Sequence, residues 1–331
     1  MQRWTLDIDT PDWQSAPEAE TACTALLNGE LVAVPTETVY GLAADATNGK
    51  ACAKIFQAKG RPQFNPLISH VSSLEAAREH GVFDAQALTL AEAFWPGPLT
   101  LVVPKKKSSP ISDLATAGLE TVALRVPAGP VMRFLADRTG RPLAAPSANL
   151  SGRISPTRAE DVIADLGSSL SVVIDAGPCA VGVESSIVGL IDGPPRLLRP
   201  GGLPREEIEK ILGRPLQNAS PDMAPEAPAA PGMLTSHYAP DAKMILNAHE
   251  ASPEDGLLSF GPDPLPGAAS ARAEVNLSPT GDLAEAAANL FQAMRTLDAS
   301  GVTTIRVQFI PSFGLGEAIN DRLRRAAAPR G

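Results

Sequence analysis

The side chains that could do chemistry in this chain are mostly cations, and the densest group lies at residues 59–70. Lys59 and Arg61 flank a glycine and precede two prolines, and Asn65 and His70 follow. Cations near a helix C-terminus are ordinary dipole partners, but arginine and lysine are also the usual partners of phosphate oxygens. A solvated charge pair would not need a loop fixed by glycine and proline. The motif therefore favours phosphate binding.

A second cation lies inside an apolar run. Residues 121–126 alternate so that Thr121, Ala123 and Arg125 share one face of a predicted strand. An arginine among apolar residues is rarely left without an anion. The partner of Arg125 is therefore either a structural carboxylate or a carboxylate of a ligand.

Hydroxyl, amide and aromatic side chains lie in loops that follow other predicted strands, where open α/β sheets bind ligands. Residues 35–42 carry Thr36 and Thr38, although such threonines also satisfy their own turns. Residues 157–160 match a capping box, so we expect Thr157 to cap a helix and Ser155 to remain available. The other candidates beside strand ends are Ser147, Asn149, Ser185 and Arg199. His237 and Tyr238 lie after the linker and before the second domain, where an ordinary interdomain anchor is the alternative.

Several common kinds of site are not indicated by this sequence. No Ser-His-Asp pattern, paired-carboxylate site or phosphate-binding P-loop motif is present, and the three cysteines lie far apart without metal-ligand spacing. Gly314-Leu315-Gly316 lacks the third glycine of a dinucleotide-binding fingerprint and is interpreted as a tight strand-to-helix turn. The candidate residues suit anion binding and charge stabilisation rather than covalent catalysis.

The elements that must position these residues alternate between short apolar runs and amphipathic stretches, which predicts an α/β fold. We expect domains at 1–217 and 239–331, joined by a proline-rich linker at 218–238 that could act as a lid. The expected strands are 31–34, 67–71, 99–103, 121–126, 172–175, 186–191, 244–246, 257–260 and 305–310. The expected helices are 18–27, 50–59, 85–94, 131–139, 158–166, 205–212, 283–297 and 317–327.

Composition agrees with a folded two-domain chain of 331 residues, 44% of them hydrophobic and 20% charged. The chain contains 32 prolines, about twice the share of ~5% expected, and we interpret them as residues that stiffen loops. A net charge of −9 argues against a surface that coats nucleic acid. Neither a signal peptide nor a membrane span is visible, so we expect a cytoplasmic protein with no membrane association.

Taken in order, these motifs resemble the threonylcarbamoyl-AMP synthase family in its longer form. That form has a YrdC-like domain, a twisted open α/β sheet with a ligand cleft, followed by a smaller Rossmann-like α/β domain. The resemblance rests on eight segments: 35–42, 59–70, 95–100, 125–127, 145–152, 184–188, 199–201 and 236–240. It extends through Gly314-Leu315-Gly316 and residues 318–322.

The resemblance implies that L-threonine, bicarbonate and ATP give L-threonylcarbamoyladenylate and pyrophosphate, and that a separate transferase uses the product on tRNA. It implies an L-threonine site of Thr38, His70, Arg125, Ala145 and Ser185, with Thr36 as an alternative to Thr38. It implies an ATP site of Lys59, Arg61, Asn65, Thr121, Ser147, Asn149, Ser155 and Arg199, completed by His237 or Tyr238.

Within that set the expected catalytic residues are Lys59, Arg61, Ser147 and Asn149. Mg²⁺ is expected to bind mainly through the ATP phosphates, with no protein metal site, no organic cofactor and no stable nucleic-acid binding. Two other functions remain open: an RNA-binding YrdC-like module and a related carbamoyl-adenylate-forming enzyme. The first conflicts with the negative charge, and the second would be expected to bring zinc-binding cysteine clusters that this sequence lacks.

Overall fold

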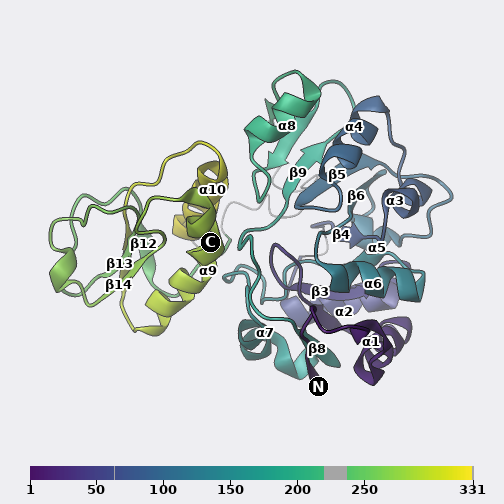
Figure 1. Cartoon of the computed structure of the whole chain (residues 1–331), viewed down its shortest axis with the longest axis horizontal. Coiled ribbons are helices and arrows are strands. Elements are labelled where there is room, and N and C mark those ends of the chain that lie inside the picture. Colours follow the sequence, from purple (N-terminus) through teal and green to yellow (C-terminus); the bar gives the residue numbers. More distant parts are fainter. Residues whose placement is uncertain (63, 220–236, 330–331) are drawn as a thin grey trace.

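The computed structural model describes residues 1–62, 64–219 and 237–329, which form two α/β units (Figure 1). The first unit contains a mixed sheet of eleven strands in the order β1-β8-β2-β3-β7-β4-β6-β5-β9-β10-β11. The second contains four strands in the order β12-β15-β13-β14, and all neighbours in it are parallel. The predicted α/β class is confirmed. Most of the expected linker at 218–238 lies outside the described residues, so the domain boundaries and the lid stay predictions.

The strands of the first unit are β1 Gln2–Thr5, β2 Val32–Val34, β3 Gly41–Asp45, β4 Ile68–His70, β5 Leu99–Pro104, β6 Thr121–Arg125, β7 Leu143–Ala144, β8 Val172–Asp175, β9 Ser186–Gly189, β10 Arg196–Arg199 and β11 Gln217–Asn218. Its α-helices are α1 Pro17–Leu27, α2 Gly49–Lys59, α3 Leu74–His80, α4 Ala85–Phe94, α5 Asp113–Thr116, α6 Pro130–Thr139, α7 Ala159–Leu166 and α8 Arg205–Leu212. The second unit has β12 Lys243–Ile245, β13 Gly256–Ser259, β14 Ala273–Asn276, β15 Thr304–Val307, α9 Leu283–Ala299 and α10 Leu315–Ala327.

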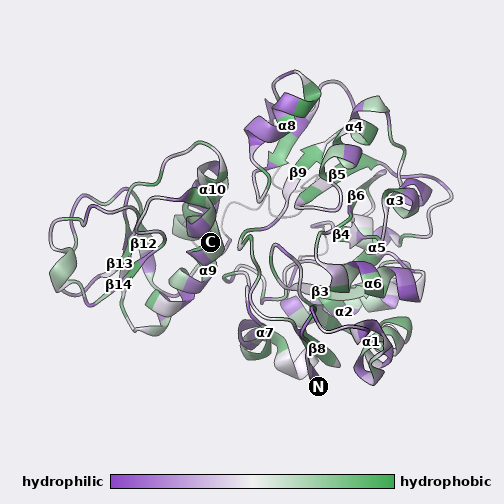
Figure 2. Ribbon diagram, in the orientation of Figure 1, coloured by the Kyte–Doolittle hydropathy of each residue, from purple (hydrophilic) through white to green (hydrophobic). Residues whose placement is uncertain are grey.

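The two faces of the large sheet are covered differently. Along β6, Val122 and Leu124 point into the main core with α2, α4 and α8, whereas Ala123 belongs to a small apolar cluster on the opposite face. On that opposite face α1 and α6 cover the strands near β2. Helix α8 alternates purple and green in Figure 2, as a helix with one buried face should. The face around β4 and β6 is therefore left for a cavity instead of a helix layer.

The second apolar core crosses from one unit to the other. Val39, Ile154 and Val183 of the first unit are buried in one cluster with the inner faces of α9 and α10. These two helices lie on the side of their sheet that faces the first unit (Figure 1). Gly182 makes the close approach possible, because a Cβ there would lie 2.4 Å from the carbonyl oxygen of Ala287 in α9. The two units thus share buried surface beside the loop that contains Val183.

Most predicted helices and strands are present within two residues, and three expectations need correction. Strand β3 begins at Gly41, inside the segment interpreted as a loop. It is not predicted because its glycine and alanines lack the β-branched pattern used to find strands. The strand predicted at 305–310 ends at Val307. The capping box at Thr157 is wrong: Arg158 occupies the N-cap of α7, and no side chain caps that helix.

Gly314-Leu315-Gly316 lies after β15 and opens α10, as the turn interpretation requires. A Cβ on Gly316 would lie 1.9 Å from the carbonyl oxygen of Pro311, so close backbone approach requires glycine there. Among the described helices, none combines the length and the apolar character needed to span a membrane.

Candidate active site

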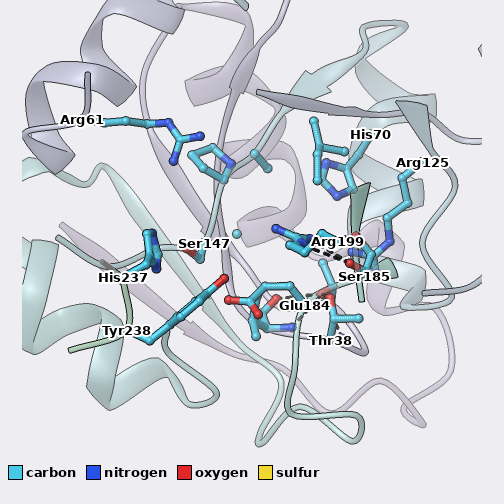
Figure 3. Close-up of a pocket in the computed structure, with 16 residues that line it drawn as sticks. Thr38, Arg61, His70, Arg125, Ser147, Glu184, Ser185, Arg199, His237 and Tyr238 are labelled. Carbon is cyan, nitrogen blue, oxygen red and sulfur yellow. Dashed lines mark hydrogen bonds between the residues drawn. The ribbon is translucent and has the colours of Figure 1, made fainter. Parts of the chain in front are cut away.

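One cavity lies over the uncovered face of the first sheet, and its walls come from segments far apart in the sequence. Figure 3 shows Arg61 and His237 at one end, His70 and Arg125 at the other, and Arg199 and Glu184 between them. All five residues expected at an L-threonine site line this cavity: Thr38, His70, Arg125, Ala145 and Ser185.

Arg125 is held ready at one end of the cavity. It ends β6, and its buried guanidinium donates from Nη2 to Glu37 Oε1 at 2.7 Å and from Nε to the carbonyl of Gly97 at 3.2 Å. Burial would raise the pKa of Glu37, but the charge of Arg125 together with hydrogen bonds from its guanidinium and from backbone N–H groups lowers that pKa. Two of five N–H donors are used in these bonds, which leaves part of the fork for another carboxylate.

His70 pairs with Arg125 across β4 and β6 and presents a neutral ring. Burial, assisted by the charge of Arg125, lowers the pKa of His70 to about 3. Its Nδ1 atom is buried and has no hydrogen-bond partner among the described residues. An orphaned polar atom in a cavity wall is costly unless a ligand or water satisfies it. His70 therefore fits a polar ligand group next to the Arg125 fork.

The two candidate threonines in the 35–42 loop differ in availability. Thr36 Oγ1 donates to the carbonyl of Val39 at 2.7 Å and accepts from the backbone N–H groups of Thr38 and Val39. Among the described residues, the Thr38 hydroxyl has one side-chain hydrogen-bond partner, Thr36 Oγ1 at 2.9 Å. Thr36 thus stabilises its own turn, and Thr38 is the better candidate for a ligand contact.

The other end of the cavity collects buried cations. Gly60, in the left-handed conformation at φ 59°, ends α2 and turns the chain so that Lys59 and Arg61 are both buried. Burial lowers the pKa of Arg61 and of Arg199 to about 10, and each is lowered further by a neighbouring arginine. Burial likewise lowers the pKa of Lys59 well below its usual range. Such a cluster suits a polyanion.

Two family models match this chain in sequence. Residues 24–201 match the Sua5–YciO–YrdC model, described as "Telomere recombination", and residues 203–328 match the model described as "Threonylcarbamoyl-AMP synthase, C-terminal domain". The threonylcarbamoyl-AMP synthase of Bacillus subtilis is 39% identical over 99% of this chain and 98% of its own length. The chain belongs to the threonylcarbamoyl-AMP synthase family.

Further relatives of this family agree over both units. The threonylcarbamoyl-AMP synthase of Pyrococcus abyssi is 42% identical over 91% of this chain and 92% of its own length. The crystal structure of P. abyssi Sua5 complexed with L-threonine superposes with a TM-score of 0.87 at 37% identity, covering 99% of this chain and 98% of that one. The arrangement of the two units is thus shared with this family.

The residues that the family resemblance assigns to ATP fall into three groups in the structure. Arg61, Ser147, Arg199, His237 and Tyr238 line the cavity. A second group is buried around it: Lys59, Asn65, Asn149 and Ser155. Thr121 belongs to neither, because it begins β6 four residues before Arg125, roughly 13 Å away along a strand. A direct ATP contact by Thr121 therefore stays a prediction.

The residues of the second group organise the walls. Lys59 Nζ donates to the carbonyl of Ser147 at 2.6 Å and also to that of Asn149. The Asn149 amide donates to the carbonyls of Leu150 and Arg153. Both amide atoms of Asn65 lack a hydrogen-bond partner among the described residues. This group therefore shapes the 147–153 loop, and Asn65 keeps an unsatisfied amide.

The sequence analysis missed Glu184 and Arg322 as site residues. Glu184 lines the cavity, where its Oε1 accepts from Ser155 Oγ at 2.6 Å and its Oε2 from Arg322 Nε at 2.8 Å. Both lie in segments that carried the resemblance, without an assigned role. A buried ion pair 138 residues apart in sequence leaves no local pattern, so only the three-dimensional structure brings it out.

Proposed function

We propose that this chain is an L-threonylcarbamoyladenylate synthase, forming threonylcarbamoyl-AMP and pyrophosphate from L-threonine, bicarbonate and ATP. The observation that carries the proposal is the polarity of one cavity. A carboxylate-binding fork at Arg125 and a neutral His70 lie at one end, and a buried cluster of cations around Arg61 and Arg199 lies at the other. An amino acid and a triphosphate would therefore meet between them.

The reaction needs positioning and charge stabilisation rather than a covalent nucleophile. Bicarbonate and the threonine amine give a carbamate with loss of water. A carbamate oxygen then attacks the α-phosphorus of ATP, and the bond to the bridging oxygen of pyrophosphate breaks. In this proposal Arg61 and Arg199 stabilise charge on the phosphoryl oxygens, and Lys59 holds the 147–149 wall against the nucleotide.

Mg²⁺ would enter with ATP and be held by its phosphate oxygens, where it supplies further charge neutralisation. In the described ranges no three His, Cys, Asp or Glu side chains lie together as a metal site would require. Glu184, the carboxylate of the cavity wall, is occupied by Ser155 and Arg322. The residues that line the cavity are therefore compatible with a metal ion that is held by the nucleotide phosphates. We further propose a cytoplasmic location and a tRNA threonylcarbamoyl transferase as the receiver of the product.

The test is product analysis by mass spectrometry after incubation with ATP, bicarbonate and L-threonine. Threonylcarbamoyl-AMP should form, and pyrophosphate release should stop when threonine alone is omitted. Release that continues without threonine would favour a different carbamoyl-adenylate-forming enzyme. RNA binding at sub-micromolar protein with no product would favour the RNA-binding module.

Arg61→Ala tests the expected phosphate contact. Loss of one preorganised charge at the reacting phosphate should lower turnover by about 100-fold or more. An Arg61→Ala protein with the parent rate would remove Arg61 from the mechanism. Arg78→Ala, in α3 outside the cavity, serves as the control and should keep the parent rate.

A further inference from the structure

One arginine of the second unit reaches the cavity wall of the first. Arg322, on α10, has a fully buried side chain. Its Nε donates to Glu184 Oε2 at 2.8 Å, and its Nη1 donates to the carbonyl of Pro200 at 2.9 Å. Its guanidinium carbon lies 5.3 Å from the ring centre of Tyr238. Arg322 therefore contacts two cavity-lining residues, Glu184 and Tyr238, and the residue that follows a third, Arg199.

The backbone around this contact is fixed as well. Gly201 packs against the chain at Glu184–Ser186, where a Cβ would lie 2.3 Å from the Glu184 carbonyl oxygen. Asp321 accepts from Arg322 Nη1 at 2.7 Å and from Arg325 Nε at 3.0 Å. The carbonyl of Arg325 in turn accepts from the backbone N–H of His237 at 3.2 Å. One end of α10 thus holds both the Glu184 loop and the chain at His237.

The charges of the cavity give this contact a consequence. Glu184 is a buried anion close to Arg199, whose Nη2 donates to the neighbouring Ser185 carbonyl at 2.9 Å. Burial would raise the pKa of Glu184, but the charges of Arg322 and then Arg199 lower it to about 2, so the carboxylate stays ionised. Without Arg322, this anion would repel ATP phosphates and attract the cations meant for them.

We propose that Arg322 is a positioning residue for the nucleotide half of the site: it engages Glu184 so that the cavity cations act on the phosphates. Arg322 does not line the cavity and is not a ligand of ATP in this scheme. The second unit therefore contributes electrostatically to a site built in the first. This inference rests on the proposed function, since it assigns the cation cluster to ATP.

The test compares Arg322→Met, Glu184→Gln and the double variant by steady-state kinetics and by binding of a non-hydrolysable ATP analogue. Arg322→Met should raise KM for ATP at least tenfold and change KM for threonine less than threefold. Glu184→Gln should either lower KM for ATP or raise it less than threefold. The double variant should return KM for ATP to within about threefold of the parent, because it removes the uncompensated charge.

A matched control is Arg295→Met. Arg295 also joins the second unit to the first, through Asp165 at 3.1 Å and the carbonyl of Ile154 at 2.6 Å, but it lies outside the cavity. Its variant should keep the parent KM for ATP. If Arg322→Met does not fold, Arg322→Lys replaces it, since an ammonium cannot reproduce the fork. A rise of threefold or more, reversed by Glu184→Gln, is then expected.

Two results would overturn the inference. One is a parental KM for ATP in Arg322→Met, or in Arg322→Lys where it replaces that variant. The other is a double variant that keeps the full loss, which would assign the pair a purely structural role. A parent protein that makes no threonylcarbamoyl-AMP would instead contradict the proposed function. The binding measurement would still report on Arg322 in that case.

Discussion

At the scale of single residues, the defining feature of the site is a set of buried cations that suits a bound anion. Lys59, Arg61 and Arg199 are all buried near one another, and Glu184 in their midst is already bound to Arg322. Buried charge is costly, so these groups hold their protons less firmly than usual. A bound triphosphate would raise the pKa values of these groups toward their usual range.

The protein should therefore take up protons when a nucleotide binds. The phosphates would raise the lowered pKa of Lys59, and a group whose pKa rises on binding gains a proton. Calorimetry of a non-hydrolysable ATP analogue at about pH 8.5, in buffers of different ionisation enthalpy, should show uptake of up to about one proton per site. Lys59→Met should abolish the uptake.

Lys54→Met is the matched control for that measurement, because Lys54 lies on the same helix and donates to the carbonyl of Gly29 instead. Its proton uptake should equal that of the parent. Equal uptake in the parent and in Lys59→Met would show that another group takes the proton.

Arg125 supports a prediction about the amino acid. Lysine cannot reproduce a fork that serves Glu37, the Gly97 carbonyl and a ligand carboxylate together. Arg125→Lys should raise KM for threonine by about 10- to 100-fold and leave KM for ATP within about twofold. Arg138→Lys, at an exposed pair with Glu20, should match the parent in both. An equal rise in both constants would place the defect in folding rather than in threonine binding.

The sequence predicts a site residue when a pattern within one segment marks it, and fails when only packing between segments brings it into the site. Arg125 and His70 are predictable because each ends a short strand, and parallel neighbours bring their ends together. Thr121 shares the Arg125 face as predicted, but a strand face says nothing about position along the strand, so its assignment to ATP stays a prediction. Glu184 and Arg322 depend on packing between the two units, which no pattern within one segment reports.

At the scale of elements, the turn after β10 controls the wall of the cavity. Gly201 packs directly on Glu184–Ser186, with the nearest atoms 2.3–2.4 Å from where its Cβ would be. Those atoms belong to backbone and cannot rotate away. The turn therefore fixes the distance between β10 and the loop that carries Glu184 and Ser185.

Gly201→Ala should move this wall. We expect a loss of about 1–3 kcal/mol in the free energy of unfolding from overpacking, together with at least a tenfold loss of activity. Gly167→Ala is the control, because its Cβ would meet Ile163 at an ordinary 3.5 Å in a right-handed backbone conformation. That variant should stay within about 1 kcal/mol of the parent. Urea unfolding and the synthase assay measure both effects, and an active Gly201→Ala protein would contradict this account.

Elements with a clear period are predicted well, and short or unpatterned ones are not. Helices α4 and α8 have the expected bounds because one apolar face repeats along each. Strands β7 and β11 contain two residues each, too few for any period to appear. Strand β3 is buried on both faces between β2 and β7, so small residues replace the usual alternation.

At the scale of the whole molecule, two buried neutral histidines link stability to pH. Burial lowers the pKa of His70 and of His237 to about 3, whereas an unfolded histidine titrates near 6.5. Below pH 6.5 the unfolded chain therefore binds protons that the folded chain does not bind. The stability held above pH 6.5 is lost as the pH falls toward 3.

These two histidines should thus lower the free energy of unfolding by up to about 2.7 kcal/mol per pH unit below pH 6, half from each, and the lowered pKa of buried His80 adds to the fall. Urea unfolding at pH 7.5, 6.5 and 5.5, followed by tryptophan fluorescence, measures it in the first unit, which holds Trp4, Trp13 and Trp95. His237→Gln or His70→Gln should each reduce the slope by up to about 1.4 kcal/mol per pH unit. A stability that is flat between pH 7.5 and 5.5 would contradict the neutral, buried state.

The apolar core shared by the two units also imposes an order on synthesis. Val39, Ile154 and Val183 leave the ribosome well before the helices that cover them. Ala326, in the same core, follows Val183 by roughly 140 residues, which is about 7–30 s at ~5–20 residues per second. During that interval the nascent first unit exposes an apolar seam and lacks the Arg322 partner of Glu184. The Glu184 contact with Arg322 therefore forms only after the second unit has been synthesised.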